Sequence, residues 1–571
     1  MSEISGYIER ITFQNPENGY TVAKLQEIGK NDLTIVVGHL PSVQPGESVR
    51  CTGKWKNHLT HGWQFEIDSY KTETPADING IKKYLGSGLI KGIGPVYAKR
   101  IVAKFGSETL MVIDSDPDKL LTVSGIGKKR IGTIKKCWED QRVIREVMIF
   151  LQQYGISPSF AQKIFRAYGK DSIKKLKDNP YNLAKDIIGI GFRSADKVAF
   201  EMGIEKGAPK RIESGIEYVL SQLSGDGHVC FPLDEFLESA EDMLEVPKKL
   251  INESVDSLVK ENRIVVFEMA HDGDLSKFIW IRPLFLAEVG IARQIRRLRL
   301  APCNLREIDT QKAVEWVQRK LGIELAENQK LAVRQSMTEK VQVITGGPGT
   351  GKSTITNAIL EITSQLTGDI LLAAPTGRAA KRMTEITGKK ALTIHSLLEF
   401  DFKIFGFKRN PENPLECDLL IVDEASMIDT LLMNSLLKAI PDHARVIFVG
   451  DINQLPSVGP GNVLKDIIAS KQVSVTMLNE IFRQAAGSRI ITNSHKINEG
   501  SFPDLSNHPT SDFFFVEAQE KEDVLDQIVS LVVHRLPKKY GYSAMEDIQV
   551  LSPMKKGVVG TENLNSVLQD A

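Results

Sequence analysis

One glycine-rich segment has the residue types and spacing of a phosphate-binding loop: Gly346-Gly347-Pro348-Gly349-Thr350-Gly351-Lys352-Ser353. Glycines let backbone N–H groups surround phosphates, a lysine brings positive charge to the β- and γ-phosphates, and a serine hydroxyl can ligate magnesium. An apolar run precedes the loop and a helical pattern follows it, as the motif requires. The sequence therefore predicts that a nucleoside triphosphate and Mg²⁺ bind here, through Gly347, Pro348, Gly349, Thr350, Gly351, Lys352, Ser353 and Thr354.

Acidic and amide side chains follow two further apolar runs. Asp423 and Glu424 come directly after residues 419–422, and Gln454 follows the run at 446–449. We expect Asp423 to hold magnesium, Glu424 to orient and deprotonate an attacking water, and Gln454 to sense the γ-phosphate. An ordinary pair of strand-end carboxylates is the alternative interpretation of the two acids.

A parallel sheet covered by helices would bring these segments together. From about residue 310 short apolar runs alternate with helical patterns, which is typical of that architecture. The carboxyl ends of parallel strands share one edge of a sheet, and ligands bind there. We therefore predict a multidomain α/β chain whose nucleotide site lies at this edge.

Four glycine turns recur between residues 81 and 204, and their first glycines are 33, 30 and 34 residues apart. Each turn lies between two short helical patterns, as in helix-hairpin-helix modules. There the backbone N–H groups at the start of the second helix can approach a DNA phosphate without reading bases. We expect such contacts at Gly92, Gly94, Gly125, Gly127, Lys128 and Lys129. The third turn has Ser157 in place of a second glycine and is interpreted as structural; a helical spacer is the alternative for the whole segment.

Charge is unevenly distributed along the chain. The total of 72 basic and 72 acidic residues gives a formal charge of zero, whereas residues 81–210 hold 25 lysines and arginines against 13 acidic residues. A local excess of this kind favours a polyanion as partner, and a solvated face is the plain alternative.

Two smaller segments flank the repeat. Residues 5–74 contain about five strand patterns separated by turn residues, which indicates a small barrel of the OB-fold type. Such a barrel contacts either single strands or a partner protein. Residues 210–305 show three helical patterns and then a hairpin, an order that suggests a winged helix.

Composition is that of an ordinary globular protein, with 42% hydrophobic and 25% charged residues. The start of the sequence lacks the features of a signal peptide, and five cysteines without C-x-x-C spacing suit reduced thiols. We expect a cytoplasmic protein.

The order of the motifs resembles superfamily 1 DNA helicases of the RecD type. The resemblance rests on six segments besides the phosphate-binding loop: Glu327-Asn328-Gln329, Ala374-Pro375-Thr376-Gly377-Arg378, Thr393-Ile394-His395, Asp423-Glu424-Ala425-Ser426-Met427, Gly450-Asp451 with Gln454-Leu455-Pro456, and Phe482-Arg483-Gln484. With the barrel and the glycine turns it extends to the long RecD-like subgroup, which acts without RecB and RecC.

The resemblance implies roles for further residues. Gln329 would contact adenine, Arg483 would act as an arginine finger at the γ-phosphate, and Pro375, Thr376 and His395 would lie near the DNA track. Residues 401–414 would form a pin that separates the duplex; a surface loop is the alternative. For His395 a packed, hydrogen-bonded histidine is an equal alternative.

The resemblance also implies ATP-driven 5′ to 3′ unwinding, Mg²⁺ as a cofactor, single-stranded DNA and duplex junctions as partners, and a function in DNA repair or recombination. We expect a monomer, with a single-strand-binding protein as a candidate partner of the barrel. A protein-remodelling ATPase and a DNA scaffold switched by ATP remain alternatives.

The family's later motifs have no counterpart before Ala571. On this basis we expect weak ATPase activity and little unwinding. The predicted domains are an OB-like barrel at 1–78, tandem helix-hairpin-helix modules at 79–208, a winged-helix-like domain at 209–308, a RecA-like domain 1A at 309–485 and the start of a RecA-like domain 2A at 486–571.

Overall fold

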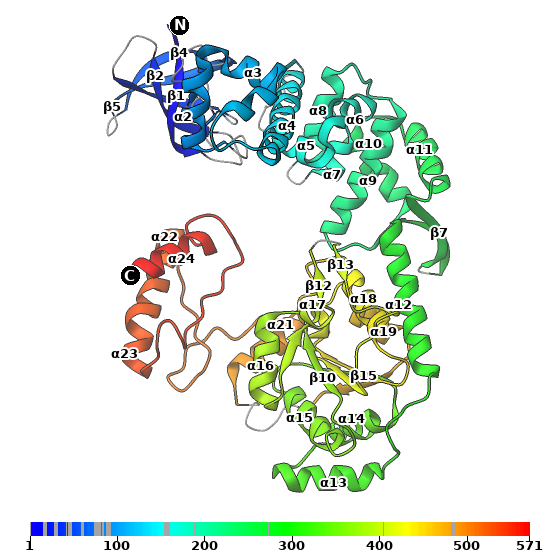
Figure 1. Ribbon diagram of the computed structural model, residues 1–571. Coiled ribbons are helices and arrows are strands. Elements are labelled where there is room, and N and C mark those ends of the chain that lie inside the picture. The colour runs from blue at the N-terminus through cyan, green and yellow to red at the C-terminus, as the bar shows by residue number, and fades with distance from the viewer. Residues whose placement is uncertain are drawn as a thin grey trace. The chain divides into compact units, whose positions relative to one another are not determined.

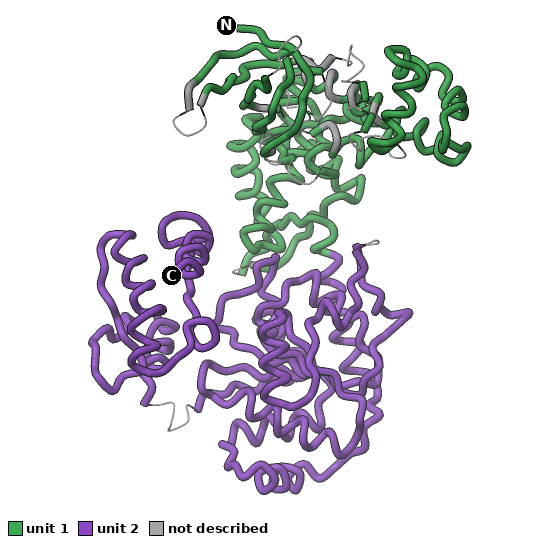
Figure 2. Tube along the Cα trace, turned by 60° about the vertical axis from the view of Figure 1, so that its left-hand side comes forward, with its two compact units in different colours: residues 1–285 green, residues 286–571 purple. Residues whose placement is uncertain are grey.

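The computed structural model describes residues 2–571 except 15–19, 28–31, 41–42, 44–47, 59–61, 74–80, 83–84, 87–92, 154–159, 188–189, 272, 403–404 and 481–486. The chain forms two compact units, Met1–Phe285 and Leu286–Ala571 (Figure 2). In the part of the chain described, no helix is both long and apolar enough to span a membrane.

The first unit begins with a closed five-stranded barrel, which confirms the predicted small barrel (Figure 1). Along the second strand buried and outward-facing residues alternate, as a barrel wall demands. Ile8, Leu25, Val36 and Phe65 fill the interior. Its strand order is β1-β2-β3-β5-β4, and the strands are β1 Ser2–Gln14, β2 Tyr20–Glu27, β3 Leu33–His39, β4 Ser48–His58 and β5 Gly62–Glu73.

Short helices follow the barrel. Of the four predicted glycine turns, the one at residues 125–127 is fully described, whereas Gly92, the turn at 154–156 and Gly189 lie outside the described residues. The elements are α2 Pro95–Phe105, η1 Gly106–Glu108, α3 Thr109–Ser115, η2 Pro117–Thr122, α4 Lys128–Gln153, α5 Ala161–Tyr168, η4 Gly169–Asp171, α6 Ser172–Asp178, α7 Asn182–Asp186 and α8 Phe192–Glu201.

Three helices and a three-stranded sheet complete the first unit. The sheet, of order β6-β8-β7, contains the predicted hairpin and one strand that the sequence pattern did not indicate, β6. A buried ion pair between Arg211 and Asp196 joins α8 to α9. The elements are α9 Pro209–Gly225, β6 Cys230–Pro232, α10 Leu233–Leu244, α11 Lys248–Lys260, β7 Ile264–His271 and β8 Asp274–Ile281.

The second unit is built on a six-stranded sheet of order β11-β10-β14-β15-β9-β16, whose paired strands are all parallel. The strands are β9 Val341–Gly346, β10 Ile370–Ala374, β11 Ala391–Thr393, β14 Leu419–Val422, β15 Arg445–Gly450 and β16 Ser474–Leu478. They are short and apolar because helices cover both faces.

One face of this sheet packs on α12, α17, α18 and α19, and the other on α13, α14, α15 and α16 (Figure 1). The helices are α12 Arg282–Leu300, α13 Thr310–Leu321, α14 Glu327–Thr338, α15 Lys352–Thr363, α16 Gly377–Thr387, α17 Ile394–Leu397, α18 Thr430–Ala439 and α19 Val463–Ala469, with the short η5 Ala425–Met427. A small hairpin, β12 Phe400–Asp401 and β13 Gly406–Phe407, projects from α17.

Residues 487–571 carry helices and loops, and their described residues include no strand: α21 Arg489–Asn498, α22 Lys521–Val529, the π-helix η6 Ser530–Arg535, α23 Leu536–Tyr540 and α24 Thr561–Asp570. The apolar segment at 548–551, expected to open a second α/β domain, is not a strand. Strands need neighbours that accept their hydrogen bonds, and no described segment pairs with this one.

Candidate functional site

The predicted phosphate-binding loop connects β9 to α15, with the geometry that its glycines imply. Gly349 has φ 76° and Gly351 has φ 85°, the left-handed region that favours glycine. Gly346 needs its small size, because a Cβ there would lie 2.6 Å from the Thr350 hydroxyl oxygen and 2.8 Å from Leu478. Ser353 and Thr354 lie in the first turn of α15, whose N–H groups have no acceptor within the helix. The loop thus has the geometry of an anion-binding turn at a helix N-terminus.

Hydrogen bonds from within the loop and from α14 stabilise the phosphate-binding loop. The Thr350 hydroxyl donates to the Gly347 carbonyl at 2.8 Å, and the Thr350 carbonyl accepts from the Gln329 amide at 3.0 Å. The Gln329 side-chain oxygen accepts from the Ala326 backbone N–H at 3.0 Å, and the residue is buried. Gln329 therefore holds the loop in position, and its contact with adenine stays a prediction.

The Lys352 side chain lies along the phosphate-binding loop. Its Nζ donates to the Gly346 carbonyl and, at 3.1 Å, to the Gly347 carbonyl. Burial lowers the pKa of this ammonium, and the carboxylates of Asp451, Glu424 and Asp423 partly oppose that shift. Three acidic groups therefore lie near one cation, and two of them, Asp423 and Glu424, were predicted from a motif separate from that of Lys352.

The acidic pair stands at the carboxyl end of β14. The Asp423 backbone N–H donates to the Ala373 carbonyl at 2.9 Å, which fixes the strand end beside β10. Burial raises the pKa of Asp423. Burial, then the neighbouring Asp423 charge, raises the pKa of Glu424.

Glu424 has the local features of a reactive group. Its backbone is left-handed, with φ 52° and ψ 40°, which costs a non-glycine residue on the order of 1 kcal/mol. Its Oε2 is buried and has no hydrogen-bond partner among the described residues. A strained, desolvated carboxylate with one free oxygen is suited to accept a proton.

Two charged residues at this edge were not singled out as functional by the sequence. Asp451 is buried directly after β15, and after burial it has the largest influence on the pKa of Lys352. Arg382 is an exposed residue of α16, and its charge lowers the pKa of both Asp423 and Glu424. The position of Asp451 at a strand end was a usable signal, whereas nothing in the local sequence distinguishes Arg382 from its neighbours.

Gln454 is exposed in a turn after β15, where its backbone N–H donates to the Asp451 carbonyl at 3.2 Å. Arg483, the expected arginine finger, lies outside the described residues. The roles of both residues at the γ-phosphate remain predictions.

The residues expected near DNA follow β10 and β11. Pro375 is half-buried, and the Thr376 hydroxyl oxygen caps α16 by accepting from the Ala379 backbone N–H at 3.2 Å. His395 is exposed, with its ring centroid 6.1 Å from that of Phe400 and 5.7 Å from that of Phe407. It therefore packs against the base of the hairpin formed by β12 and β13.

That hairpin occupies the place of the predicted pin. Phe402 and Phe405 at its tip are 79% and 80% exposed. Exposed aromatic rings on a projecting hairpin offer stacking surfaces for bases, so the geometry suits a pin.

The glycine turn before α4 resembles the phosphate-binding loop in its backbone. Gly125 has φ 90°, and a Cβ there would lie 3.0 Å from the Tyr97 ring. The Arg130 side chain donates to the Gly125 carbonyl and stacks on Tyr97, with its guanidinium carbon 4.1 Å from the ring centroid. Arg130 therefore stabilises the turn, whereas Lys128 and Lys129 are exposed.

In the three turns that have a second glycine, this glycine differs from Gly125 in its surroundings. Gly94 precedes α2, Gly127 precedes α4 and Gly191 precedes α8, and a Cβ at each would meet no atom within 4 Å. None of the three has a positive φ in the range that requires glycine. Packing within the described chain does not require these glycines. Gly94 and Gly191 are helix N-caps, a position that favours glycine, and the missing side chains would also let a phosphate approach closely.

Domain families match four parts of the chain. They are an OB-fold domain of the ATP-dependent DNA helicase YrrC at residues 1–75, a SAM-like helix-hairpin-helix tandem at 87–140, the helix-hairpin-helix domain of ATP-dependent RecD2 DNA helicases at 140–230 and an AAA domain at 329–460.

One relative matches nearly the whole chain, and two others match parts of it. The ATP-dependent RecD2 DNA helicase of Deinococcus radiodurans is 31% identical over 99% of this chain and 78% of its own length. The RecD subunit of the RecBCD enzyme of Buchnera aphidicola is 30% identical over 48% of this chain and 50% of its own. The Dda helicase of phage T4 is 38% identical over 24% of this chain and 34% of its own. The barrel, the glycine turns and the sheet edge with the phosphate-binding loop occur together in one chain. The protein belongs to the family of RecD2-type ATP-dependent DNA helicases.

Proposed function

We propose that this chain hydrolyses ATP at the β9–α15 loop, with Glu424 as the base that takes the proton from the attacking water. The observation that carries this proposal is the buried Oε2 of Glu424, which has no hydrogen-bond partner among the described residues and lies at the same sheet edge as Lys352. Lys352 stabilises negative charge on the β- and γ-phosphates. Arg483 and Gln454 would act at the γ-phosphate.

The residues of this edge fit a magnesium ion. Mg²⁺ prefers oxygen ligands and is often held by one or two protein oxygens together with substrate phosphates. The Asp423 carboxylate and the Ser353 hydroxyl are oxygen donors that follow β14 and the loop, and burial of Asp423 favours its pairing with a cation. When bound, the ion would supply positive charge to the phosphates.

For the DNA we propose 5′ to 3′ translocation on a single strand and opening of duplex at a junction. The turn before α4 would hold the sugar-phosphate backbone, and residues 375–376 and His395 would border the strand. The exposed rings of Phe402 and Phe405 support a strand-separating role for the hairpin. The polarity comes from the family resemblance. We further propose that the protein acts as a monomer and that a single-strand-binding protein contacts the barrel.

Two measurements on the 571-residue chain test the proposal. Lys352→Ala should abolish DNA-stimulated phosphate release, because no other described lysine lies in the loop. Equal hydrolysis by this variant and the parent would show that the loop is not the reaction site.

Polarity is tested with 5′-tailed and 3′-tailed duplexes of one sequence. We expect little opening by these 571 residues, and we expect what opening there is to require the 5′ tail; opening that requires the 3′ tail would reverse the assignment. If neither duplex opens while ATP is still hydrolysed, the chain works as a DNA-bound ATPase without unwinding.

A further inference from the structure

A histidine outside all the motifs touches the phosphate-binding loop. His495 lies on α21, and a Cβ placed on Gly347 would be 3.2 Å from its Cε1 and 3.7 Å from its Nε2. The imidazole therefore covers the backbone of Gly347, the second glycine of the loop. A side chain at position 347 would displace it.

The ring presents a polar atom at this point that has no partner within the described chain. Nε2 of His495 is buried and has no hydrogen-bond partner among the described residues. A buried nitrogen without a partner is destabilising, and such atoms are rare in folded proteins. Its position beside a loop that binds phosphates suggests that a phosphate oxygen supplies the missing partner.

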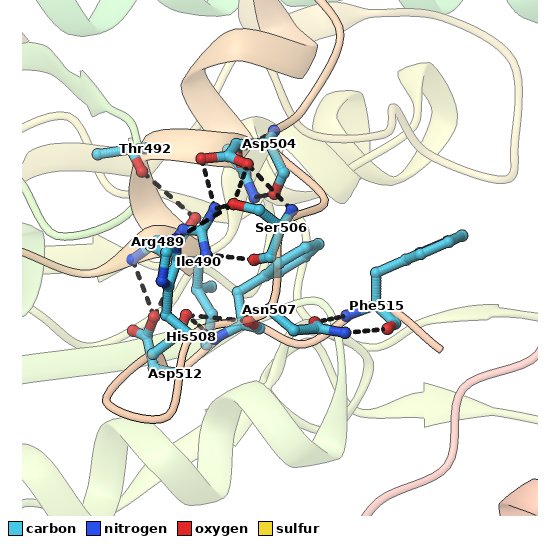
Figure 3. A network of polar contacts seen from close by, with 12 residues as sticks. Arg489, Ile490, Thr492, Asp504, Ser506, Asn507, His508, Asp512 and Phe515 are labelled. Carbon is cyan, nitrogen blue, oxygen red and sulfur yellow. Dashed lines mark hydrogen bonds and ion pairs between the residues drawn. The ribbon is translucent and has the colours of Figure 1, made fainter. Parts of the chain in front are cut away.

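The helix that carries His495 is firmly held at its start (Figure 3). The Asp512 carboxylate accepts hydrogen bonds from the backbone N–H groups of Arg489, at 2.8 Å, and Ile490, at 3.3 Å. The Arg489 side chain pairs with Asp504 and donates to Ser506. Hydrogen bonds from Ser506, and then from Arg489, lower the pKa of Asp504. A hydrogen bond from the Ser488 hydroxyl, and then the backbone N–H groups of Arg489 and Ile490, lower the pKa of Asp512.

A second anchor lies one turn further along α21. The buried Asn493 side chain donates to the Asp504 carbonyl at 3.0 Å and accepts from the Asp504 backbone N–H at 2.8 Å. His495 follows Asn493 by two residues, which is roughly 200° around a helix. The loop at 504–512 thus fixes one side of α21 while His495 projects from another.

The position of Lys352 indicates which phosphates the ring would meet. Its Nζ donates to the carbonyls of Gly346 and Gly347, next to the imidazole, and this lysine serves the β- and γ-phosphates in loops of this type. We propose that Nε2–H of His495 donates a hydrogen bond to a γ-phosphate oxygen of bound ATP, so that α21 distinguishes the triphosphate from the diphosphate. The role of His495 rests on the nucleotide site proposed above.

Binding of fluorescent nucleotides to the 571-residue chain tests the contact without relying on turnover. His495→Ala should raise the Kd of mant-AMPPNP about tenfold, as expected for loss of one hydrogen bond to a charged group. The Kd of mant-ADP should stay within about twofold, since that ligand has no γ-phosphate. His495→Gln, whose amide can still donate, should recover most of the affinity for mant-AMPPNP.

The matched control is His508→Gln, because His508 is an exposed histidine in the loop that anchors α21. It should bind both nucleotides as the parent does. Equal weakening of both nucleotides by His495→Ala would assign the residue a structural role only, and unchanged affinities would remove the contact; either result overturns the inference. Lys352→Ala distinguishes failure of the histidine contact from failure of the proposed nucleotide site. If this variant also binds both nucleotides normally, the proposed nucleotide site is wrong, not only the histidine contact.

Discussion

The loop before α15 and the turn before α4 use the same backbone device for different purposes. In each, a glycine with positive φ, Gly351 or Gly125, reverses the chain just before a helix whose first N–H groups lack acceptors. Lysines begin both helices: Lys352 in α15, and Lys128 with Lys129 in α4.

The two regions differ in what surrounds the lysines. Lys352 is partly buried beside three carboxylates, and one oxygen of Glu424 has no hydrogen-bond partner in the described part of the chain. Lys128 and Lys129 are exposed to solvent. A buried mixture of charges can stabilise a transition state, but exposed cations and N–H groups can only bind an anion. In the proposed function a helix N-terminus would provide phosphate affinity in both places, and the buried acids would make chemistry possible in one.

The largest expected effect is that removal of the base lowers ATP hydrolysis and leaves DNA binding unchanged. Glu424→Gln keeps the size of the side chain but cannot take a proton, so the rate of ATP hydrolysis should fall on the order of a hundredfold to a thousandfold. Binding of mant-AMPPNP and of single-stranded DNA should stay close to the parent values. Phosphate release measures the rate, and Glu385→Gln, on the exposed face of α16, is the matched control. A Glu424→Gln enzyme as fast as this control would mean that another group is the base.

The two glycines of the turn at α4 should respond in opposite ways. Gly125→Ala should destabilise the fold by about 1–3 kcal/mol, because the backbone is left-handed there and the new methyl meets Tyr97. Gly127→Ala should leave the melting temperature nearly unchanged and weaken binding of single-stranded DNA several-fold, on the order of 1 kcal/mol, because its methyl stands where a phosphate would approach. Thermal melts and fluorescence anisotropy measure the two effects. If Gly127→Ala binds DNA normally, the turn is a spacer.

The same contrast explains how much the sequence could predict. The phosphate-binding loop, the acidic pair and the glycine turns are patterns of residues that are adjacent in the sequence. The barrel strands show a local alternation of buried and outward-facing residues. Two contacts could not be predicted in this way: the hydrogen bond from Gln329 to Thr350, and the packing of His495 on Gly347. Each joins segments that are far apart in the sequence and meet only in the folded protein. The apolar segment at 548–551 is not a strand for a related reason: a local apolar pattern does not supply the partner that a strand needs.

Neutralising the exposed lysines should produce a smaller, salt-dependent change. In Lys128→Gln/Lys129→Gln, two phosphate contacts would be lost, which lowers the slope of log K against log salt by about 1.4 for a single strand. DNA affinity should therefore fall several-fold at low salt and much less at high salt. ATP hydrolysis without DNA should not change, since neither lysine belongs to the nucleotide site. Lys99→Gln/Lys119→Gln, two exposed lysines outside the turn, is the control; an equal change in slope would mean that the charge of the whole segment acts, not the turn.

The smallest expected effect concerns the pH dependence of hydrolysis. The pKa of Glu424 is raised by burial and by Asp423, so its active, deprotonated form is lost as the pH falls through a value higher than that of an exposed glutamate. The charge of Arg382 works against this shift, so Arg382→Gln should raise the pKa further and move the acid limb of kcat to higher pH. Arg382→Lys keeps the charge and should leave the limb close to that of the parent. A limb that moves to lower pH in Arg382→Gln would mean that Glu424 is not the group titrated. DNA binding at the turn involves no such base, so its dependence on pH should be the same in all three proteins.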